Sequence, residues 1–266
     1  MKTKLFFLIL LLTKGFHAFA GKENYLVRCN QKLVEVVMED LFTPVVASRV
    51  NAYPNLAAYA VLAQKGKALE PLEGKLNQFE KISAPSTRVD LSLSALFAFT
   101  TTAKKLIYSE YMFDQFEAKE SEVWLRNNKK DTLLLRLSKE YGRQVAKEII
   151  VWMKKDIYDY TRTLMRYVIT DTAGAWIPTG PGYANALEPN WPLMRSFVFD
   201  STNAVKAIPN VKYSEDKNSE YYKNAFALYQ QSQNLDTAKR LIAWYWDNNP
   251  NILKSDGPLI HCHYLR

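Results

Sequence analysis

Three residues near the end of the chain have side chains that often bind transition metals. His261, Cys262 and His263 place two imidazoles and a thiol side by side, and these are donors that zinc and copper accept. The rest of the sequence offers no second Cys or His cluster to complete the coordination. We therefore predict a disordered tail here instead of a metal site.

Acidic side chains form a second candidate, because paired carboxylates can act as general acid and base. They fall in two predicted helices: Glu110, Asp114, Glu117, Glu120 and Glu122 in the first, Asp156 and Asp159 in the second. Lys119, Lys154 and Lys155 share their faces at helical spacing, so we predict a solvated charged surface. A sugar-binding or glycan-processing protein stays open as a weaker alternative, because aromatic and acidic side chains also line sugar sites.

Common catalytic motifs are missing from the sequence. It contains no G-x-x-x-x-G-K-[ST], G-x-G-x-x-G, G-x-S-x-G or H-E-x-x-H. Besides His261 and His263, the chain has a single histidine, His17. Chemistry that depends on histidine must use the C-terminal pair or do without.

The elements that would position these residues are helices. Apolar side chains recur at helical spacing over residues 31–42, 44–64, 92–108, 111–125, 131–168, 220–231 and 236–246. No segment has the alternating pattern of a β-strand, so the predicted fold class is all-α, a helical bundle. In the longest segment, Gly142 weakens the helix without ending it.

The segment 44–64 is expected to be a buried central helix. Thr43 suits the N-cap, and Pro44 suits the first helical position, where its missing N–H is not needed. Pro54 is expected to kink or restart the helix. Alanines along this segment would let a neighbouring helix approach closely; they are Ala47, Ala52, Ala57, Ala58 and Ala60.

The first twenty residues are typical of a secretory signal peptide. Lys2 and Lys4 precede an apolar run of eight residues, and Ala18-Phe19-Ala20 forms a small-x-small cleavage site. The run is too short for a membrane span, which needs about 20 residues. We predict an exported protein, periplasmic or secreted, with no stable membrane span after cleavage of residues 1–20.

Charge and cysteine content narrow the range of partners. Loss of the signal, with Lys2, Lys4 and Lys14, lowers the net charge from +8 to +5. The remaining basic residues alternate with acids, which argues against nucleic-acid binding. Cys29 and Cys262 are left either to form one disulfide or to stay unpaired.

A proline-rich stretch interrupts the helices at residues 176–197, "WIPTGPGYANALEPNWPLMRSF". Together with "DLFTPVVASRVNAYPNLAAYAVL", "VWMKKDIYDYTRTLMRYVI" and "AWYWDNNPN", it resembles exported vanadium-dependent haloperoxidases and related acid phosphatases of the phosphatidic acid phosphatase type 2 superfamily. The type found in Bacteroidetes is the most similar, and the resemblance covers residues 31–251. It implies an ordered segment over a helical bundle, with Trp176, Trp191 and Phe197 as buried anchors.

The resemblance also implies a chemistry that this chain lacks. Family members hold vanadate or phosphate with the motifs K-x6-R-P, P-S-G-H and S-R-x5-H-x3-D, all C-terminal to the matched region. None of these motifs occurs in this sequence. We therefore predict no catalytic, cofactor-binding or metal-binding residue, and no cofactor for this chain, although vanadate serves its full-length relatives.

The chain is thus expected to contain a signal peptide (1–20), a haloperoxidase-like N-terminal region (21–251) and a divergent, disordered tail (252–266). The sharp loss of resemblance after residue 251 suggests truncation by a frameshift or a premature stop. The first interpretation is a pseudoenzyme that is inactive alone. The alternative is a helical interaction module or half of a split enzyme, whose partner is a second copy or a separately encoded C-terminal half.

Overall fold

The computed structural model describes residues 25–65, 69–180, 182–199 and 211–246, and every regular element within them is helical. The α-helices are α2 (Tyr25–Glu39), α3 (Pro44–Leu62), α4 (Leu91–Lys104), α5 (Glu110–Asn127), α6 (Thr132–Lys154), α7 (Tyr158–Thr161), α8 (Glu220–Gln233) and α9 (Thr237–Trp246). Short 3-10 turns follow at Ala63–Lys65 and Trp191–Leu193. The all-α prediction is confirmed. The predicted signal peptide and tail lie outside the described residues.

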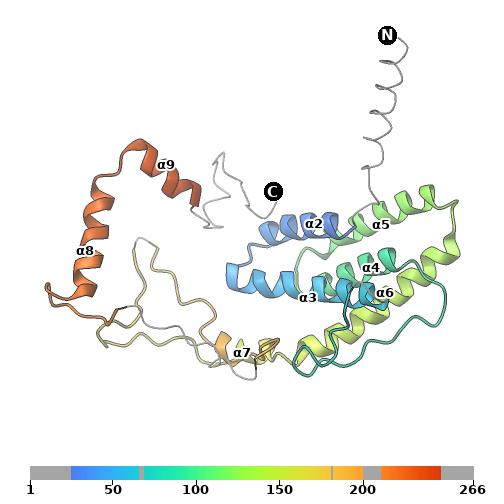
Figure 1. The fold of residues 1–266 in the computed structure, drawn as a ribbon, viewed down its shortest axis with the longest axis horizontal. Coiled ribbons are helices and arrows are strands. Elements are labelled where there is room, and N and C mark those ends of the chain that lie inside the picture. The colour runs from blue at the N-terminus through green and yellow to red at the C-terminus, as the bar shows by residue number, and fades with distance from the viewer. Residues whose placement is uncertain (1–24, 66–68, 181, 200–210, 247–266) are drawn as a thin grey trace, which may run out of the picture.

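Helices α2 to α6 form a bundle whose centre is α4 (Figure 1). This helix is apolar on all sides, and a helix of that kind must be surrounded by other helices. Helices α3 and α6 pack most extensively against it. The predicted central helix, α3, is therefore a neighbour of the true centre, and it buries Ala57, Ala58 and Ala60.

Gly142 marks the closest approach between α6 and α4. A Cβ atom at this position would lie 2.3 Å from the Ser94 carbonyl oxygen and 2.9 Å from the Phe97 Cβ. The helix continues through the glycine, as predicted, because tertiary packing outweighs its low helix propensity. The small residue is what lets the two backbones meet.

The start of α3 follows the sequence prediction in part. Pro44 is the first helical residue, but the Thr43 side chain makes no capping hydrogen bond. Pro54 does not restart the helix: α3 runs through it as one element, with Pro54 buried. Asp90 is the more effective cap, since its carboxylate accepts hydrogen bonds from the backbone N–H groups of Ser92 and Leu93 at the start of α4.

The single helix predicted over residues 131–168 is wrong beyond Lys154. Ile157 has a left-handed backbone (φ 60°), and the Asp156 carboxylate accepts a hydrogen bond from Tyr158 N–H at the start of α7. The later apolar residues leave the bundle, and Met165 is 79% exposed. The hydrophobic periodicity of the sequence therefore extends beyond the residues that pack against the bundle.

Helices α8 and α9, here called the arm (residues 220–246), stand apart from the bundle in Figure 1. Both were predicted within a few residues, and Asp236 accepts a hydrogen bond from Lys239 N–H, as expected at the start of a helix. None of the residues of α8 is buried. Across the described ranges, no helix has the length and apolar character needed to cross a membrane.

Candidate functional site

The metal-binding candidates His261, Cys262 and His263 lie outside the described residues, so that prediction is untested. So is the pairing of Cys29 with Cys262. Cys29 itself is buried in α2, and this burial, together with the nearby charge of Glu120, raises the pKa of its thiol. The side chain therefore stays protonated at neutral pH.

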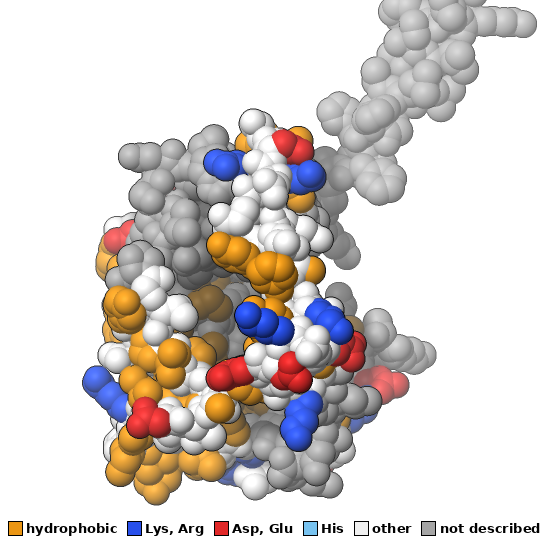
Figure 2. Space-filling view, turned by 90° about the vertical axis from the view of Figure 1, so that its left-hand side faces the viewer, with side chains coloured by type: hydrophobic (Ala, Val, Ile, Leu, Met, Phe, Trp, Pro, Cys, Tyr) orange, Lys and Arg blue, Asp and Glu red, His pale blue; other side chains and the backbone are white. Residues whose placement is uncertain are grey.

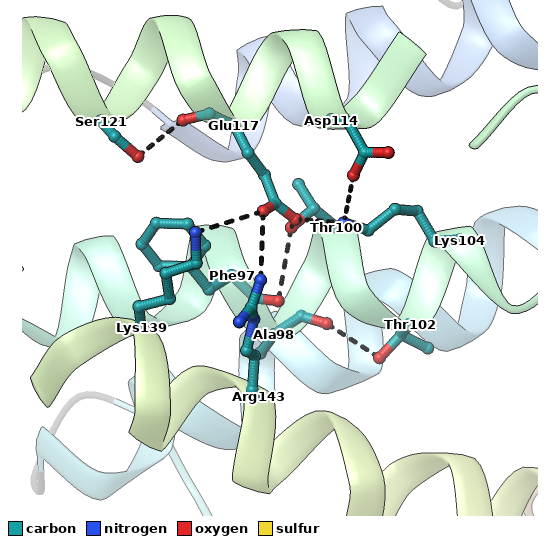
Figure 3. A network of polar contacts seen from close by, with 10 residues as sticks. All are labelled: Phe97, Ala98, Thr100, Thr102, Lys104, Asp114, Glu117, Ser121, Lys139 and Arg143. Carbon is teal, nitrogen blue, oxygen red and sulfur yellow. Dashed lines mark hydrogen bonds and ion pairs between the residues drawn. The ribbon is translucent and has the colours of Figure 1, made fainter. Parts of the chain in front are cut away.

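Glu117 of α5 is the centre of a buried polar network, shown in Figure 3. Its carboxylate accepts a hydrogen bond from Thr100 Oγ1 (2.6 Å) and forms an ion pair with Lys104 Nζ (2.8 Å). Lys139 and Arg143 of α6 approach it to 3.9 Å. The acid therefore holds α4, α5 and α6 together.

The pKa values of two lysines in this network are shifted by their surroundings. Burial tends to lower the pKa of Lys104, but its hydrogen bonds to Glu117 and Asp114 outweigh that effect and raise it. Burial and the charge of Arg143 lower the pKa of Lys139. Each cation of the network lies within 4 Å of a carboxylate, so its best-supported role is structural.

The prediction of a solvated charged surface is wrong for three of the acids. Glu117, Glu120 and Asp156 are buried, whereas Glu110, Asp114, Glu122 and Asp159 are exposed. Glu120 accepts two hydrogen bonds from Arg28 of α2, at 2.9 and 2.6 Å. Cations on other helices neutralise these acids, and spacing along one helix cannot reveal such partners.

Asp156 joins α6 to α3. Its carboxylate accepts hydrogen bonds from Arg49 Nε and Tyr53 Oη, both at 2.8 Å, and it is 1% exposed. Burial and the neighbouring Asp156 raise the pKa of Tyr53 well above its usual value. The sequence carried a signal for this burial, since Val145, Ile149, Trp152 and Asp156 lie on one face of the helical repeat.

The proline-rich segment is attached to the bundle mainly at its C-terminal end. The Phe197 ring contacts Tyr53 and Trp152, with centroids 5.3 and 5.4 Å apart. Arg195 Nη1 donates to the Asn77 carbonyl oxygen (2.9 Å), and its guanidinium lies over Trp152. Phe197 is an anchor, as predicted. Trp176 is not, since it is 47% exposed and contacts Tyr167.

Beside this segment lies an open cleft of about 540 Å³, lined by residues from the α2–α3 turn, Tyr108, α7 and residues 185–190. Phe42 and Tyr108 stack in one wall, with ring centroids 5.4 Å apart. Arg162 forms an ion pair with Glu188 in another. The cleft combines aromatic surface with a few polar groups, as ligand sites commonly do.

The described residues do not fit vanadate or another oxyanion that needs a histidine. The three histidines of the sequence all lie outside the described ranges. Among residues that the structure describes, no three His, Cys, Asp or Glu side chains are grouped to hold a metal ion. The basic residues around Glu117 are already engaged with acids.

Comparison with known proteins gives one informative result. No protein-family model matches the sequence, and no curated protein matches it either. The crystal structure described as the first bacterial vanadium-dependent iodoperoxidase is similar, with 34% identity and a TM-score of 0.80. The alignment covers 86% of this chain and 56% of the iodoperoxidase, so this chain spans little more than half the length of that protein.

At this identity and TM-score, this chain and the iodoperoxidase are similar in both sequence and backbone fold. The resemblance predicted from the helical segments and the proline-rich loop is confirmed. The chain therefore has a vanadium haloperoxidase-like helical fold, equivalent to the N-terminal half of such an enzyme.

Proposed function

We propose that this chain is an exported, haloperoxidase-like scaffold that does not bind vanadate or oxidise halide without a complementary C-terminal half. The alignment carries this proposal, because it uses 86% of this chain but only 56% of the iodoperoxidase. A scaffold of this kind would supply helices that support an oxyanion site whose ligands come from elsewhere. Export rests on the signal-like residues 1–20.

The composition of the chain supports the absence of an oxyanion site. An oxyanion of this kind needs several converging cations and a histidine in a preorganised pocket. The sequence contains neither an Arg-Pro dipeptide nor Ser-Gly-His. In the described part, the largely buried cations Arg49 and Lys104 each pair with a carboxylate.

The exposed surface of the arm supports a role in assembly. Phe226 is 45% exposed, Tyr229 58% and Ile242 59%, and the rings of Tyr222, Phe226 and Tyr229 stack along α8. Figure 2 views the molecule from the arm's side and shows hydrophobic side chains in patches around a hollow. An apolar face of this kind is typical of an interface.

The test is a halogenation assay. We expect the purified chain with orthovanadate, hydrogen peroxide and iodide or bromide to give no dye halogenation above the blank. A complete vanadium-dependent iodoperoxidase under the same conditions is the positive control. Vanadate-dependent turnover by this chain alone would refute the proposal.

The exposed arm also favours a second candidate, a non-enzymatic interaction module. Mixing the chain with a C-terminal half that contains P-S-G-H distinguishes the two. Formation of a complex with recovered halogenation supports the scaffold of a split enzyme. A stable complex with a different exported protein, and no activity with the C-terminal half, supports the module.

A further inference from the structure

The cleft beside Tyr108 is bounded by strained backbone. Leu41 and Glu188 line it with φ of 58° and 46°, and Ile157, next to the lining residue Tyr158, has φ of 60°. This left-handed region is unfavourable for residues with a side chain, most of all for β-branched isoleucine. Such strain gathers at ligand sites, where the surrounding structure maintains it.

Several polar groups of the cleft already have protein partners. The Asp40 carboxylate accepts hydrogen bonds from the N–H groups of Tyr108 (2.8 Å) and Ser109 (3.2 Å). Glu188 pairs with Arg162, and the Glu188 side chain is only 9% exposed. Asn190 Nδ2 donates to the carbonyl oxygen of Met165 (3.2 Å).

Arg166 differs from these groups. It lines the cleft, and within the described ranges its guanidinium has no acidic partner. A ligand would therefore meet one available cation, together with polar groups of Thr43, Tyr158 and Asn185 that line the cleft. That arrangement favours a single anionic group, and a guanidinium binds a carboxylate through two parallel hydrogen bonds.

The remaining surface is aromatic or aliphatic. The Tyr108 ring stacks on Phe42 with an interplanar angle of 18°, yet Tyr108 is 81% exposed. One face of the ring is therefore left for a ligand. Val46, Leu164 and Leu187 also line the cleft. This stacking face and the aliphatic side chains beside it favour a planar aromatic ring as the apolar part of a ligand.

We infer that this cleft binds a small aromatic carboxylate, with its ring against Tyr108 and its carboxylate against Arg166. The volume of about 540 Å³ is ample for such a molecule. This inference does not depend on the proposed scaffold role. It concerns only residues of the described chain.

Phenylacetate titrated into the purified chain, with binding followed by ligand-detected NMR, tests the inference. We expect a dissociation constant on the order of 1 mM, typical of a small ligand. Arg166→Gln should weaken binding roughly threefold to fivefold, the effect of one exposed charged contact. Tyr108→Ala should weaken it similarly, and Tyr108→Phe should keep it because the ring remains.

Matched controls separate the site from general effects. Arg136→Gln removes an exposed arginine on the far part of α6 and should leave binding unchanged. Benzyl alcohol lacks the charge and should bind more weakly than phenylacetate. Thermal unfolding of each variant shows that it is folded before its binding is compared.

Two outcomes would overturn the inference. The first is phenylacetate binding that is absent in the folded protein, or equal in the parent chain, Arg166→Gln and Tyr108→Ala. The second is tighter binding of glucuronate than of phenylacetate, which would assign the cleft to a sugar acid instead.

Discussion

Buried carboxylates at three positions connect different helices, and two of them connect helices that are distant in sequence. Glu120 joins α5 to α2, Glu117 joins α5 to α4 and α6, and Asp156 joins α6 to α3. A charge removed from water is costly unless its partner is close and well oriented. These residues therefore specify which helices lie together, in addition to any stability that they contribute.

Asp156→Ala is expected to destabilise the chain strongly. It leaves Arg49, whose side chain is 9% exposed, with an uncompensated charge, and it removes a hydrogen bond from Tyr53. The expected loss is about 3 kcal/mol in the free energy of urea unfolding. Asp159→Ala, at an exposed position three residues on, should change it by less than about 0.5 kcal/mol. Equal effects of the two substitutions would contradict the proposed role of Asp156.

The raised pKa of Tyr141 predicts that the protein loses stability at alkaline pH. Burial, with the charge of Glu148, raises the pKa of Tyr141 from 10.0 to about 12. The neutral phenol is thus favoured in the folded state. Its contribution to the free energy of unfolding is complete below pH 10 and is lost as the pH rises towards 12. Tyr141→Phe should reduce the fall in unfolding free energy over this range, by up to about 1.4 kcal/mol per pH unit.

Urea unfolding at several alkaline pH values measures this slope. Tyr111→Phe, which removes a phenol hydroxyl at an exposed position of α5, is measured beside it as the matched control. The pKa of Tyr53 is also raised by burial and by Asp156, so we expect Tyr53 to contribute to the slope that remains in Tyr141→Phe. A slope unchanged by Tyr141→Phe would show that its ionisation is not linked to folding.

The helices themselves were largely predictable, and their ends less so. Hydrophobic periodicity located each long helix, because one face must be buried. It failed after Asp156, where apolar residues such as Met165 keep the periodicity but leave the bundle. It also started α2 six residues late, since Tyr25 is the first residue of that helix and residue 31 was predicted. Packing partners, which one sequence does not reveal, decide these ends.

Gly142→Ala is a test at the scale of helix packing. Alanine is the better helix former by about 1 kcal/mol, so an isolated helix would be stabilised. Here the added Cβ would meet the Ser94 carbonyl oxygen at 2.3 Å, and α6 would have to move away from α4. We expect a net loss of about 1–3 kcal/mol in unfolding free energy. Gln144→Ala, at an exposed position of α6, should be close to neutral, and a stabilised Gly142→Ala would disprove the close contact.

The whole molecule divides into a well-packed bundle and an exposed arm. Helix α4 is buried along most of its length, whereas α8 has no buried residue. Local opening requires less free energy where fewer apolar contacts must be broken. The arm should therefore open independently of the bundle.

Hydrogen exchange followed by mass spectrometry tests this division. We expect amides of α8 and α9 to exchange faster than those of α4 and α6, because their apolar side chains are largely exposed. A complementary half that covers the arm should slow its exchange and leave the bundle unchanged. Protection of α8 and α9 above that of α4 in the chain alone would contradict this picture.

The cleft could not be predicted from the sequence, because its residues come from separate segments of the chain. Phe42, Tyr108 and Glu188 are far apart along the chain, and they come together only through the turn after α2 and the course of residues 185–190. The sequence pointed instead to clustered acids and to the C-terminal histidines. Residues that are neighbours in sequence are easy to recognise as a group. The residues of this cleft are far apart in sequence, so no local pattern reveals them.

The uneven attachment of the proline-rich segment has a consequence for proteolysis. Tyr183 is 68% exposed, whereas further along Arg195 and Phe197 are fixed to Asn77 and Trp152 of the bundle. A protease that cuts near Tyr183 would divide the polypeptide into two fragments of unequal mass. Because contacts on both sides of the cut hold the fragments together, the nicked protein should still elute from a sizing column as a single particle, and only a denaturing gel should reveal the break.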